Sequence, residues 1–206
     1  MSYRQERRSD MGKIFIVSGK SATGKDTIYK RLVEDKALAL TTIVSYTTRP
    51  IRNNELDGVE YHFVTEEELE DLKGKGTIIE QRSYYTVSGL WHYFTVHDGQ
   101  FDNENANYIL IGTLEQYEKI RNYFGEERVL PIYIEVDAAL RLIRSIEREQ
   151  EQVNPKYAEI CRRFLADEED FSEENLKRLG IEKRYNNENL DACVEMIKTD
   201  IMYALK

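Results

Sequence analysis

Residues 13–27, KIFIVSGKSATGKDT, constrain the fold of this 206-residue chain more than any other stretch. Their first six residues form a short apolar run that predicts a buried strand, and a helical pattern continues from Lys25 through Leu32. Between them, Gly19 and Gly24 bound a loop whose backbone N–H groups, together with the helix N-terminus, can face an anion, while Lys25 adds a point charge. The strand before and the helix after favour this phosphate cradle over an ordinary glycine turn with Asp26 at the positive helix end. We therefore expect the chain to bind nucleotide phosphates.

Strands and helices alternate at both ends of the chain, which predicts an α/β fold with a parallel sheet and right-handed crossovers. Helices are expected at residues 25–36, 114–124, 140–149, 155–170 and 188–205, with another after Thr65. Strands are expected at 41–47, 59–64, 107–111 and 129–136, with a run of short strands over 77–96 and a turn near Ser88-Gly89. The strand-rich stretch between 45 and 97 departs from this rhythm. It is interpreted as a small mixed subdomain at the C-terminal edge of the sheet, where such sheets bind ligands.

Composition excludes several classes of protein. A net charge of −9 argues against broad binding to nucleic acid, and no apolar run approaches the ~20 residues of a membrane span. Cys161 and Cys193 have no metal-binding spacing and are expected to be free, buried thiols of a cytoplasmic protein. Residues 1–10 are polar and predict a frayed leader, with Met11 as a second candidate start.

A second group of candidate residues lies between 45 and 95. Arg49 and Arg52 are three apart on a predicted loop, followed by Tyr61, Glu80 and Tyr93. Two guanidinium groups with tyrosine hydroxyls suit a second phosphate group, and a carboxylate can accept two N–H groups from a purine edge. Each residue alone is more ordinary as a solvated charge or a packed ring, but together, behind a phosphate loop, they predict a second nucleotide.

Nearly the whole chain from residue 13 onward resembles the guanylate kinases. The most specific stretch is VSYTTRPIRNNELDGVEYHF, residues 44–63, which matches the S-x-T-T-R-x-x-R…G-x-x-Y-x-F signature of that family. The segments LIRSIERE and ICRRF are similar to its arginine-bearing lid, and YNNENL contains the asparagine that the family places by adenine.

The resemblance implies a role for each matched residue. On this basis the ATP-binding residues are Gly19, Lys20, Ser21, Ala22, Thr23, Gly24, Lys25, Asp26, Thr27 and Asn187. The residues expected to act catalytically on the phosphates are Lys25, Arg144, Arg148 and Arg163. The GMP-binding residues are Arg49, Arg52, Tyr61 and Tyr93 at the phosphate, and Ser45, Glu80 and Thr95 at the base.

Three positions depart from the family pattern. Asp26 stands where Ser is usual, with the hydroxyl following at Thr27; Ile111-Gly112-Thr113 replaces an acidic D-x-D; and Tyr93-Phe94 replaces Tyr-Gly. The first two remove oxygen atoms that help to orient Mg²⁺, so Asp26 or Thr27, acting through water, are the candidate contacts to the metal. The segment RSYYTVSGLWHYFTVHDG is also longer than the family norm.

The resemblance implies a P-loop nucleoside monophosphate kinase that uses Mg²⁺ and transfers the γ-phosphoryl of ATP to GMP, and to dGMP, giving GDP. A core at 11–42, 98–140 and 172–206 would carry an NMP-binding subdomain at about 43–97 and a helical lid at about 141–171, all in one domain over 11–206. Two alternatives remain open. One is a kinase for another nucleoside monophosphate, and the other is a binding module that keeps the fold without turnover; the retained Lys25, Arg144, Arg148 and Arg163 favour an enzyme.

Overall fold

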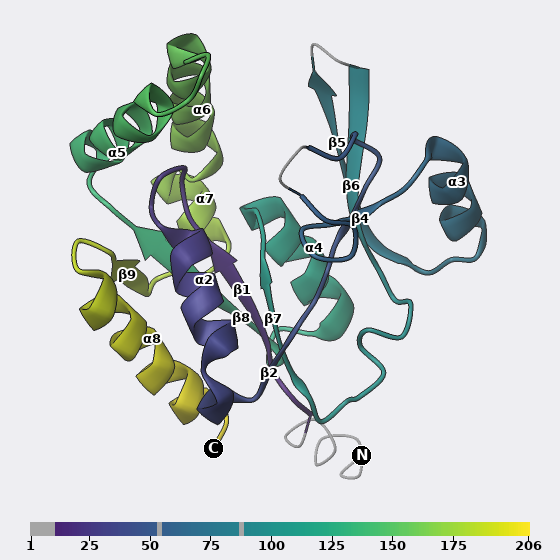
Figure 1. Ribbon diagram of the computed structural model, residues 1–206. Helices are drawn as coiled ribbons and strands as arrows, with labels where there is room; N and C mark the ends of the chain where they lie inside the picture. The colour runs from purple at the N-terminus through teal and green to yellow at the C-terminus, as the bar shows by residue number, and fades with distance from the viewer. Residues whose placement is uncertain (1–10, 53–54, 87–88) are drawn as a thin grey trace.

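The computed structural model describes residues 11–52, 55–86 and 89–206 (Figure 1). The expected leader at 1–10, and Ser88 of the expected turn, lie outside the described residues.

The core is a five-stranded parallel sheet with strand order β2-β7-β1-β8-β9. The strands are β1 (Ile14–Ser18), β2 (Leu40–Thr42), β7 (Asn107–Ile111), β8 (Val129–Glu135) and β9 (Arg184–Asn186). Strand β1 lies at the centre and is buried along its whole length, as expected for a parallel strand covered on both faces. The α/β class and the parallel core are therefore as predicted.

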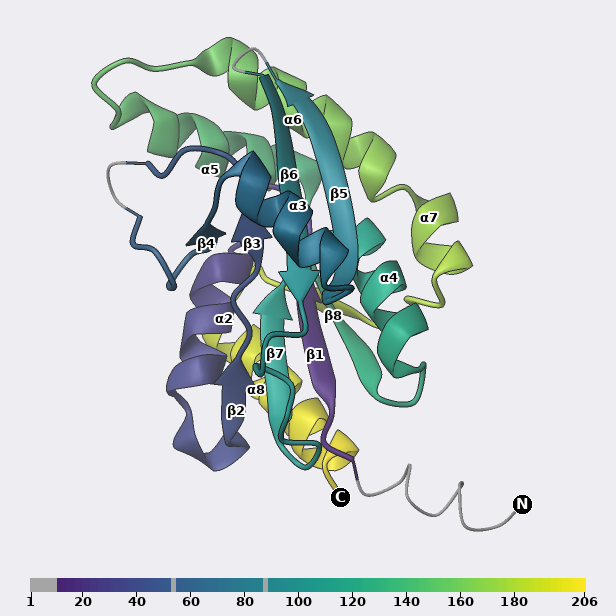
Figure 2. The same cartoon turned by 90° about the vertical axis from the view of Figure 1, so that its right-hand side faces the viewer.

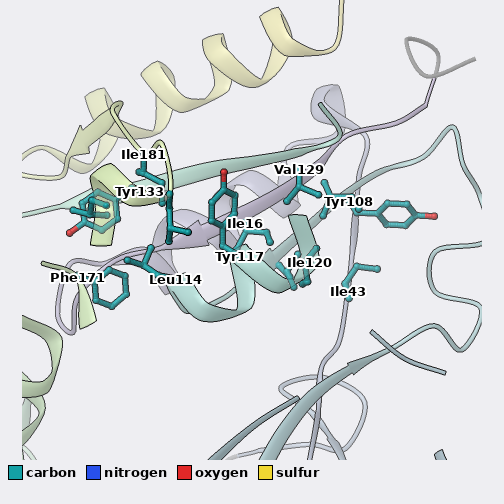
Figure 3. Packing of buried hydrophobic residues seen from close by; sticks show 14 of the residues in the cluster. Ile16, Ile43, Tyr108, Leu114, Tyr117, Ile120, Val129, Tyr133, Phe171 and Ile181 are labelled. Atoms are coloured by element: carbon teal, nitrogen blue, oxygen red, sulfur yellow. The ribbon is translucent and has the colours of Figure 1, made fainter. Parts of the chain in front are cut away.

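Helices cover both faces of this sheet because the side chains of β1 alternate between them (Figures 1 and 2). Phe15 and Val17 pack with α2 (Lys25–Glu34) and α8 (Leu190–Ala204). Ile14 and Ile16 pack on the other face with α4 (Leu114–Phe124) and α7 (Glu173–Arg178), as Figure 3 shows for part of this cluster. Fully burying such an aliphatic side chain stabilises the fold by about 1.5–3 kcal/mol, so these layers fix the position of the loop that leaves β1.

A second, mixed sheet has strand order β4-β3-β6-β5. It contains β3 (Tyr46–Thr47), β4 (His62–Phe63) and the long antiparallel hairpin of β5 (Ile78–Thr86) and β6 (Gly89–Val96). Helix α3 (Glu66–Gly74) covers it through Leu69, and begins with a capping box between Thr65 and Glu68. In Figure 1 this sheet rises on one side of the core, and helices α5 (Ala138–Gln150) and α6 (Tyr157–Asp170) rise on the other.

Several expected elements differ in the structure. The strand expected at 41–47 is divided between the two sheets, because the chain crosses from one to the other near Val44, whose N–H and C=O both bond to the Gln100 side chain. The strand expected at 59–64 is only β4, since residues 56–61 form turns. The run of short strands over 77–96 is one hairpin of two long strands.

Other differences are smaller. The first helix ends at Glu34, two residues early, and Asp35 caps a separate 3₁₀ turn, Lys36–Leu38. The sequence pattern does not reveal α7 and β9, which have six and three residues and carry too little periodicity to be seen alone. Cys193 is buried as expected, but Cys161 is exposed, because α6 buries none of its residues fully.

Candidate functional site

The phosphate loop lies between β1 and α2, as predicted. A Cβ atom at Gly19 would lie 2.5 Å from the carbonyl oxygen of Ile134, so only glycine allows the loop to pass this close to β8. Gly24 has φ = +81°, and α2 begins after it without a side-chain cap. The first N–H groups of a helix have no partner inside the helix, so this end of α2 can bind an anion.

Three side chains of the loop set its charge and shape. Lys25 is mostly buried, and its Nζ lies 4.0 Å from Oδ2 of Asp26, whose side chain is 81% exposed. Thr27 is exposed in the first turn of α2. Thr23 is buried, and its hydroxyl donates to the carbonyl of Lys20 at 2.8 Å. Ala22 takes a left-handed conformation, φ = +63°, which is uncommon for a residue with a side chain.

Asn187 is part of the loop's support. Its side chain is buried and Nδ2 donates to the carbonyl of Thr23 at 2.8 Å. Its Oδ1 has no hydrogen-bond partner among the described residues, and its backbone carbonyl accepts from Nη2 of Arg144 at 3.1 Å. Asn187 and Arg144, expected at the adenine and at the ATP phosphates, therefore form one chain of contacts that ends on the phosphate loop.

Two other arginines expected in the lid line a cavity. Arg148 on α5 and Arg163 on α6 bound a space of about 120 Å³ together with Ser21 of the phosphate loop. Nε of Arg163 donates to Glu159 at 3.0 Å, and the pKa of Glu159 falls to about 2 through the hydrogen bond of Arg162 first and that of Arg163 next. The structure thus places Arg148 and Arg163 around one cavity with Ser21 of the phosphate loop.

Acidic residues near the end of α6 contact the phosphate loop, which sequence reasoning did not anticipate. The N–H of Ser21 donates to Oδ2 of Asp167 at 2.6 Å, and Nζ of Lys20 lies 2.7 Å from Oε2 of Glu168. Arg141 of α5 is buried, bonds to Glu168 through Nη2, and lies 4.8 Å from the ring centre of Phe164. Burial raises the pKa of Glu168, but Lys20 and Arg141 lower it further than burial raises it. These contacts depend on how α5 packs on α6, so no local signal in the sequence reveals them.

The residues expected around a second phosphate gather at β3, β4 and β6. Arg49 is buried and forms a two-pronged ion pair with Glu55, at 2.7 Å and 2.6 Å, while its guanidinium lies 5.1 Å from the centre of the Tyr61 ring. Tyr61 in turn packs edge-on to Tyr93 at 5.6 Å. Arg52 contacts Glu55 through its backbone N–H at 2.9 Å and is exposed. Glu55 was not among the predicted residues.

The ion pair shifts both ionisation equilibria. Burial lowers the pKa of Arg49, but the hydrogen bonds and charge of Glu55 raise it above its ordinary value. The hydrogen bonds from Arg49 hold the pKa of the Glu55 carboxyl below its usual range. Glu55 is thus an internal carboxylate that accepts from both terminal nitrogens of the Arg49 guanidinium.

The three residues expected at the base form a buried polar network with Gln116. The Thr95 hydroxyl donates to Oε1 of Glu80 at 2.8 Å, and Nε2 of Gln116 donates to Oγ of Ser45 and to Oγ1 of Thr95, both at 3.1 Å. Gln116 was not predicted; it follows Thr113 by three residues, at the start of α4. Arg82, also not predicted, donates to Glu80 through Nε at 3.0 Å. The network therefore includes the Glu80 carboxylate, which is already paired with the Arg82 cation.

Within residues 11–52, 55–86 and 89–206 there is no cluster of three or more His, Cys, Asp or Glu side chains that could hold a metal ion. No helix in that same part of the chain is both long and apolar enough to span a membrane.

Comparisons with known proteins agree on one family. A family model described as guanylate kinase matches residues 11–173. A guanylate kinase of Malacoplasma penetrans is 30% identical over 192 residues, which cover 89% of this chain and 85% of that protein. A guanylate kinase of Vibrio parahaemolyticus is 39% identical over 93 residues, or 43% of this chain and 45% of that protein.

The fold agrees as well. A crystal structure of guanylate kinase from Anaplasma phagocytophilum has a TM-score of 0.68 to this chain at 19% sequence identity, and the match covers 94% of this chain and 86% of that one. At this identity the likeness supports a shared fold and no more.

Proposed function

The chain belongs to the guanylate kinase family, and from this premise we propose that it transfers the γ-phosphoryl group of ATP to GMP and to dGMP. An oxygen of the acceptor phosphate attacks the γ-phosphorus in line, the bond to the β-γ bridging oxygen breaks, and ADP leaves. A phosphate oxygen is already nucleophilic, so the reaction needs no strong base, and catalysis rests on positioning and on neutralising charge. The observation that carries the proposal is the uncapped N-terminus of α2, which directly follows the glycine-bounded loop and begins with Lys25.

We assign the ATP phosphates to the loop from Gly19 to Thr27, that is Gly19, Lys20, Ser21, Ala22, Thr23, Gly24, Lys25, Asp26 and Thr27. Arg148 and Arg163 face the same loop across the cavity that Ser21 lines, so they are placed to neutralise charge on the transferring group. Arg144 acts on the loop indirectly, because it donates to the backbone carbonyl of Asn187, whose side chain donates to the carbonyl of Thr23. A contact of Asn187 with adenine remains part of the proposal.

The acceptor lies between the second sheet and the core. Arg49, Arg52, Tyr61 and Tyr93 bind its phosphate, and the phosphate takes the place that Glu55 occupies on Arg49. Ser45, Glu80 and Thr95 read the base, because a carboxylate accepts both N1–H and the exocyclic amine of guanine and meets a lone pair on adenine. Sites that hydrogen-bond a substrate in this way reject analogues by ~10⁴ or more.

Mg²⁺ is the proposed cofactor. Its preferred partners are one or two protein oxygens completed by substrate phosphates and water, which suits the exposed Asp26 and Thr27 beside the loop. These two residues would hold the ion, directly or through water, once ATP is present. When bound, the ion neutralises charge that develops on the phosphates. We place the reaction in the cytoplasm, where two free thiols such as Cys161 and Cys193 persist.

The test is an assay of ADP release with GMP, dGMP, AMP, CMP and UMP as acceptors. We expect GMP and dGMP to be used far better than the others; a preference for AMP or a pyrimidine nucleotide would refute the assignment, and GMP binding without ADP release would indicate a binding module. Lys25→Ala should reduce turnover by roughly 10²–10³-fold, because a charge at the transition state is lost, while GMP affinity stays near wild type. Lys30→Ala, which removes an exposed lysine of the same helix, is the matched control and should keep the wild-type rate.

A further inference from the structure

The base-reading carboxylate of the proposed site is already bound by a side chain of the protein itself. Glu80 and Arg82 are two residues apart on β5, so their side chains project from the same face of the strand. Nε of Arg82 lies 3.0 Å from Oε2 of Glu80, and Nη2 lies 3.2 Å from Oε1. Both are withdrawn from solvent, with side-chain exposures of 0% for Glu80 and 6% for Arg82.

The guanidinium group makes the contact that guanine would make. It presents two adjacent, parallel N–H groups to both oxygens of a carboxylate, and the N1–H and exocyclic amine of guanine form the same pair. A carboxylate offers a single edge on which both oxygens accept from one partner in this way. Since Thr95 occupies a further acceptor site on Oε1, Arg82 and guanine cannot both bind that edge of Glu80.

We propose that Arg82 is a specificity-determining residue that competes with guanine for Glu80 and must be displaced when GMP binds. The inference rests on the proposed function and adds a residue to its acceptor site. Arg82 gives the buried carboxylate a partner within the protein, which avoids the cost of a buried charge without a partner. Because Arg82 must first be displaced from Glu80, it lowers the affinity of the site for any base. Adenine and the pyrimidines lack two adjacent donors and cannot replace Arg82, so they are excluded.

The surroundings of Arg82 offer the displaced guanidinium other partners. Its Nη1 already donates to Oγ1 of Thr113 at 3.3 Å. The pKa of Tyr84 on the same strand is raised mainly by burial. The charge of Arg82 lowers this pKa, and the carboxylates of Glu115 and Asp170 raise it. These two acidic groups lie on α4 and at the end of α6. The Thr113 hydroxyl is therefore an acceptor that the guanidinium can keep when it leaves Glu80.

The experiment is calorimetric titration of GMP, dGMP and AMP into the full chain without ATP, for wild type and Arg82→Ala. Hydrogen bonds to charged groups contribute enough that removing the internal competitor should lower the Kd for GMP by roughly tenfold or more. The affinity for AMP should rise far less, since adenine has nothing to donate to the vacated edge. Arg82→Lys, which keeps a charge but loses the paired N–H groups, should give an intermediate Kd.

The control is Arg128→Ala. Arg128 is also buried, and its Nε donates to the carbonyl of Gly12 at 2.9 Å, at the N-terminal end of β1 and away from the second sheet. The Arg128→Ala variant should be less stable than wild type in thermal unfolding but should have the same Kd for GMP. If Arg82→Ala fails to fold, Arg82→Lys replaces it in the comparison, and its Kd for GMP should also be lower than that of wild type.

Unchanged or weaker GMP binding in the folded Arg82 variants would overturn the inference, and weaker binding would mean that Arg82 stays in place and donates to the base. The absence of measurable GMP binding in all variants would also overturn it. The ADP-release assay separates this result from the proposed function. Tighter GMP binding by Arg82→Ala without turnover of GMP by the wild type would uphold the inference and refute the activity, while turnover without tighter binding would do the reverse.

Discussion

Replacing Gly24 with alanine tests how closely the phosphate loop is held by Asn187. Gly24 has φ = +81°, and a Cβ atom there would lie 2.5 Å from Nδ2 of Asn187. The matched control is Gly76, which has φ = +67° and where an added Cβ atom would meet no heavy atom within 4 Å. Both alanine variants therefore suffer the left-handed backbone conformation, but only Gly24→Ala also pushes on a neighbouring side chain.

The magnitude follows from these contacts. A left-handed conformation costs a residue with a side chain about 1–2 kcal/mol, partly offset by the lower entropy of the unfolded chain. Gly76→Ala should therefore lower the free energy of unfolding by about 1 kcal/mol. In Gly24→Ala the amide of Asn187 must also leave the carbonyl of Thr23, now 2.8 Å away. Leaving these buried groups unpaired should cost a further amount of about 1–3 kcal/mol.

Urea unfolding of the two variants measures this difference, with equal m values as the sign that both unfold in the same way. Adding Asn187→Ala to Gly24→Ala removes the side chain that clashes, so the double variant should be more stable than the sum of the single changes predicts. The displaced loop should also lower kcat/KM for ATP by roughly tenfold to a hundredfold. Equal losses of stability in Gly24→Ala and Gly76→Ala, with additive behaviour in the double variant, would refute the proposed contact.

Three further outcomes are expected. The pKa of Glu55 lies below the ordinary 4.5, so its ion pair contributes stability that is present above that value and is lost as the pH falls through the lower folded-state pKa. Urea unfolding should therefore show wild type to be more stable than Glu55→Gln near neutral pH. A difference in the free energy of unfolding that stays constant down to acid pH would contradict the ion pair. Asp167→Asn removes an anion from the N–H of Ser21, so KM for ATP should fall about threefold to tenfold, whereas an unchanged or higher KM would show that Asp167 does not oppose the phosphates. A thiol reagent should modify one cysteine of the native protein, Cys161, because burial raises the pKa of Cys193 to about 11; labelling that persists in Cys161→Ala would disprove this.

The parts of the fold and site that could be predicted are those encoded locally. The loop from Gly19 to Lys25 follows a strand and precedes a helix, and its glycines are required by contacts that any such loop makes. The strand at 107–111 and the helix at 114–124 have the predicted bounds, because their apolar periodicity is strong and their ends carry clear signals, such as the cap at Thr113.

What could not be predicted depends on residues that meet only in three dimensions. The stretch from 41 to 47 has a continuous strand pattern, yet its two ends belong to different sheets, because Gln100 provides hydrogen bonds to Val44 at the crossing. Cys161 is exposed because α6 packs against α5 and does not bury any of its residues fully. In the same way, the sequence shows that Glu80 and Arg82 share a strand face, but not that this face is buried.

Two buried ion pairs, Arg49–Glu55 and Glu80–Arg82, involve groups that the proposed function assigns to the acceptor. In the proposed site, each pair joins a group assigned to GMP to an internal group that resembles part of the nucleotide: Glu55 resembles the phosphate on Arg49, and Arg82 resembles the base edge on Glu80. Under this proposal, binding is an exchange of partners: the buried charges are paired both before and after it, and the full cost of desolvating them is met during folding. A ligand that supplies only one of the two replacements displaces one internal partner and gains no compensation at the other end. We therefore expect selection to act on the whole nucleoside monophosphate, because only a molecule with a phosphate at one end and two adjacent N–H donors at the other completes both proposed exchanges.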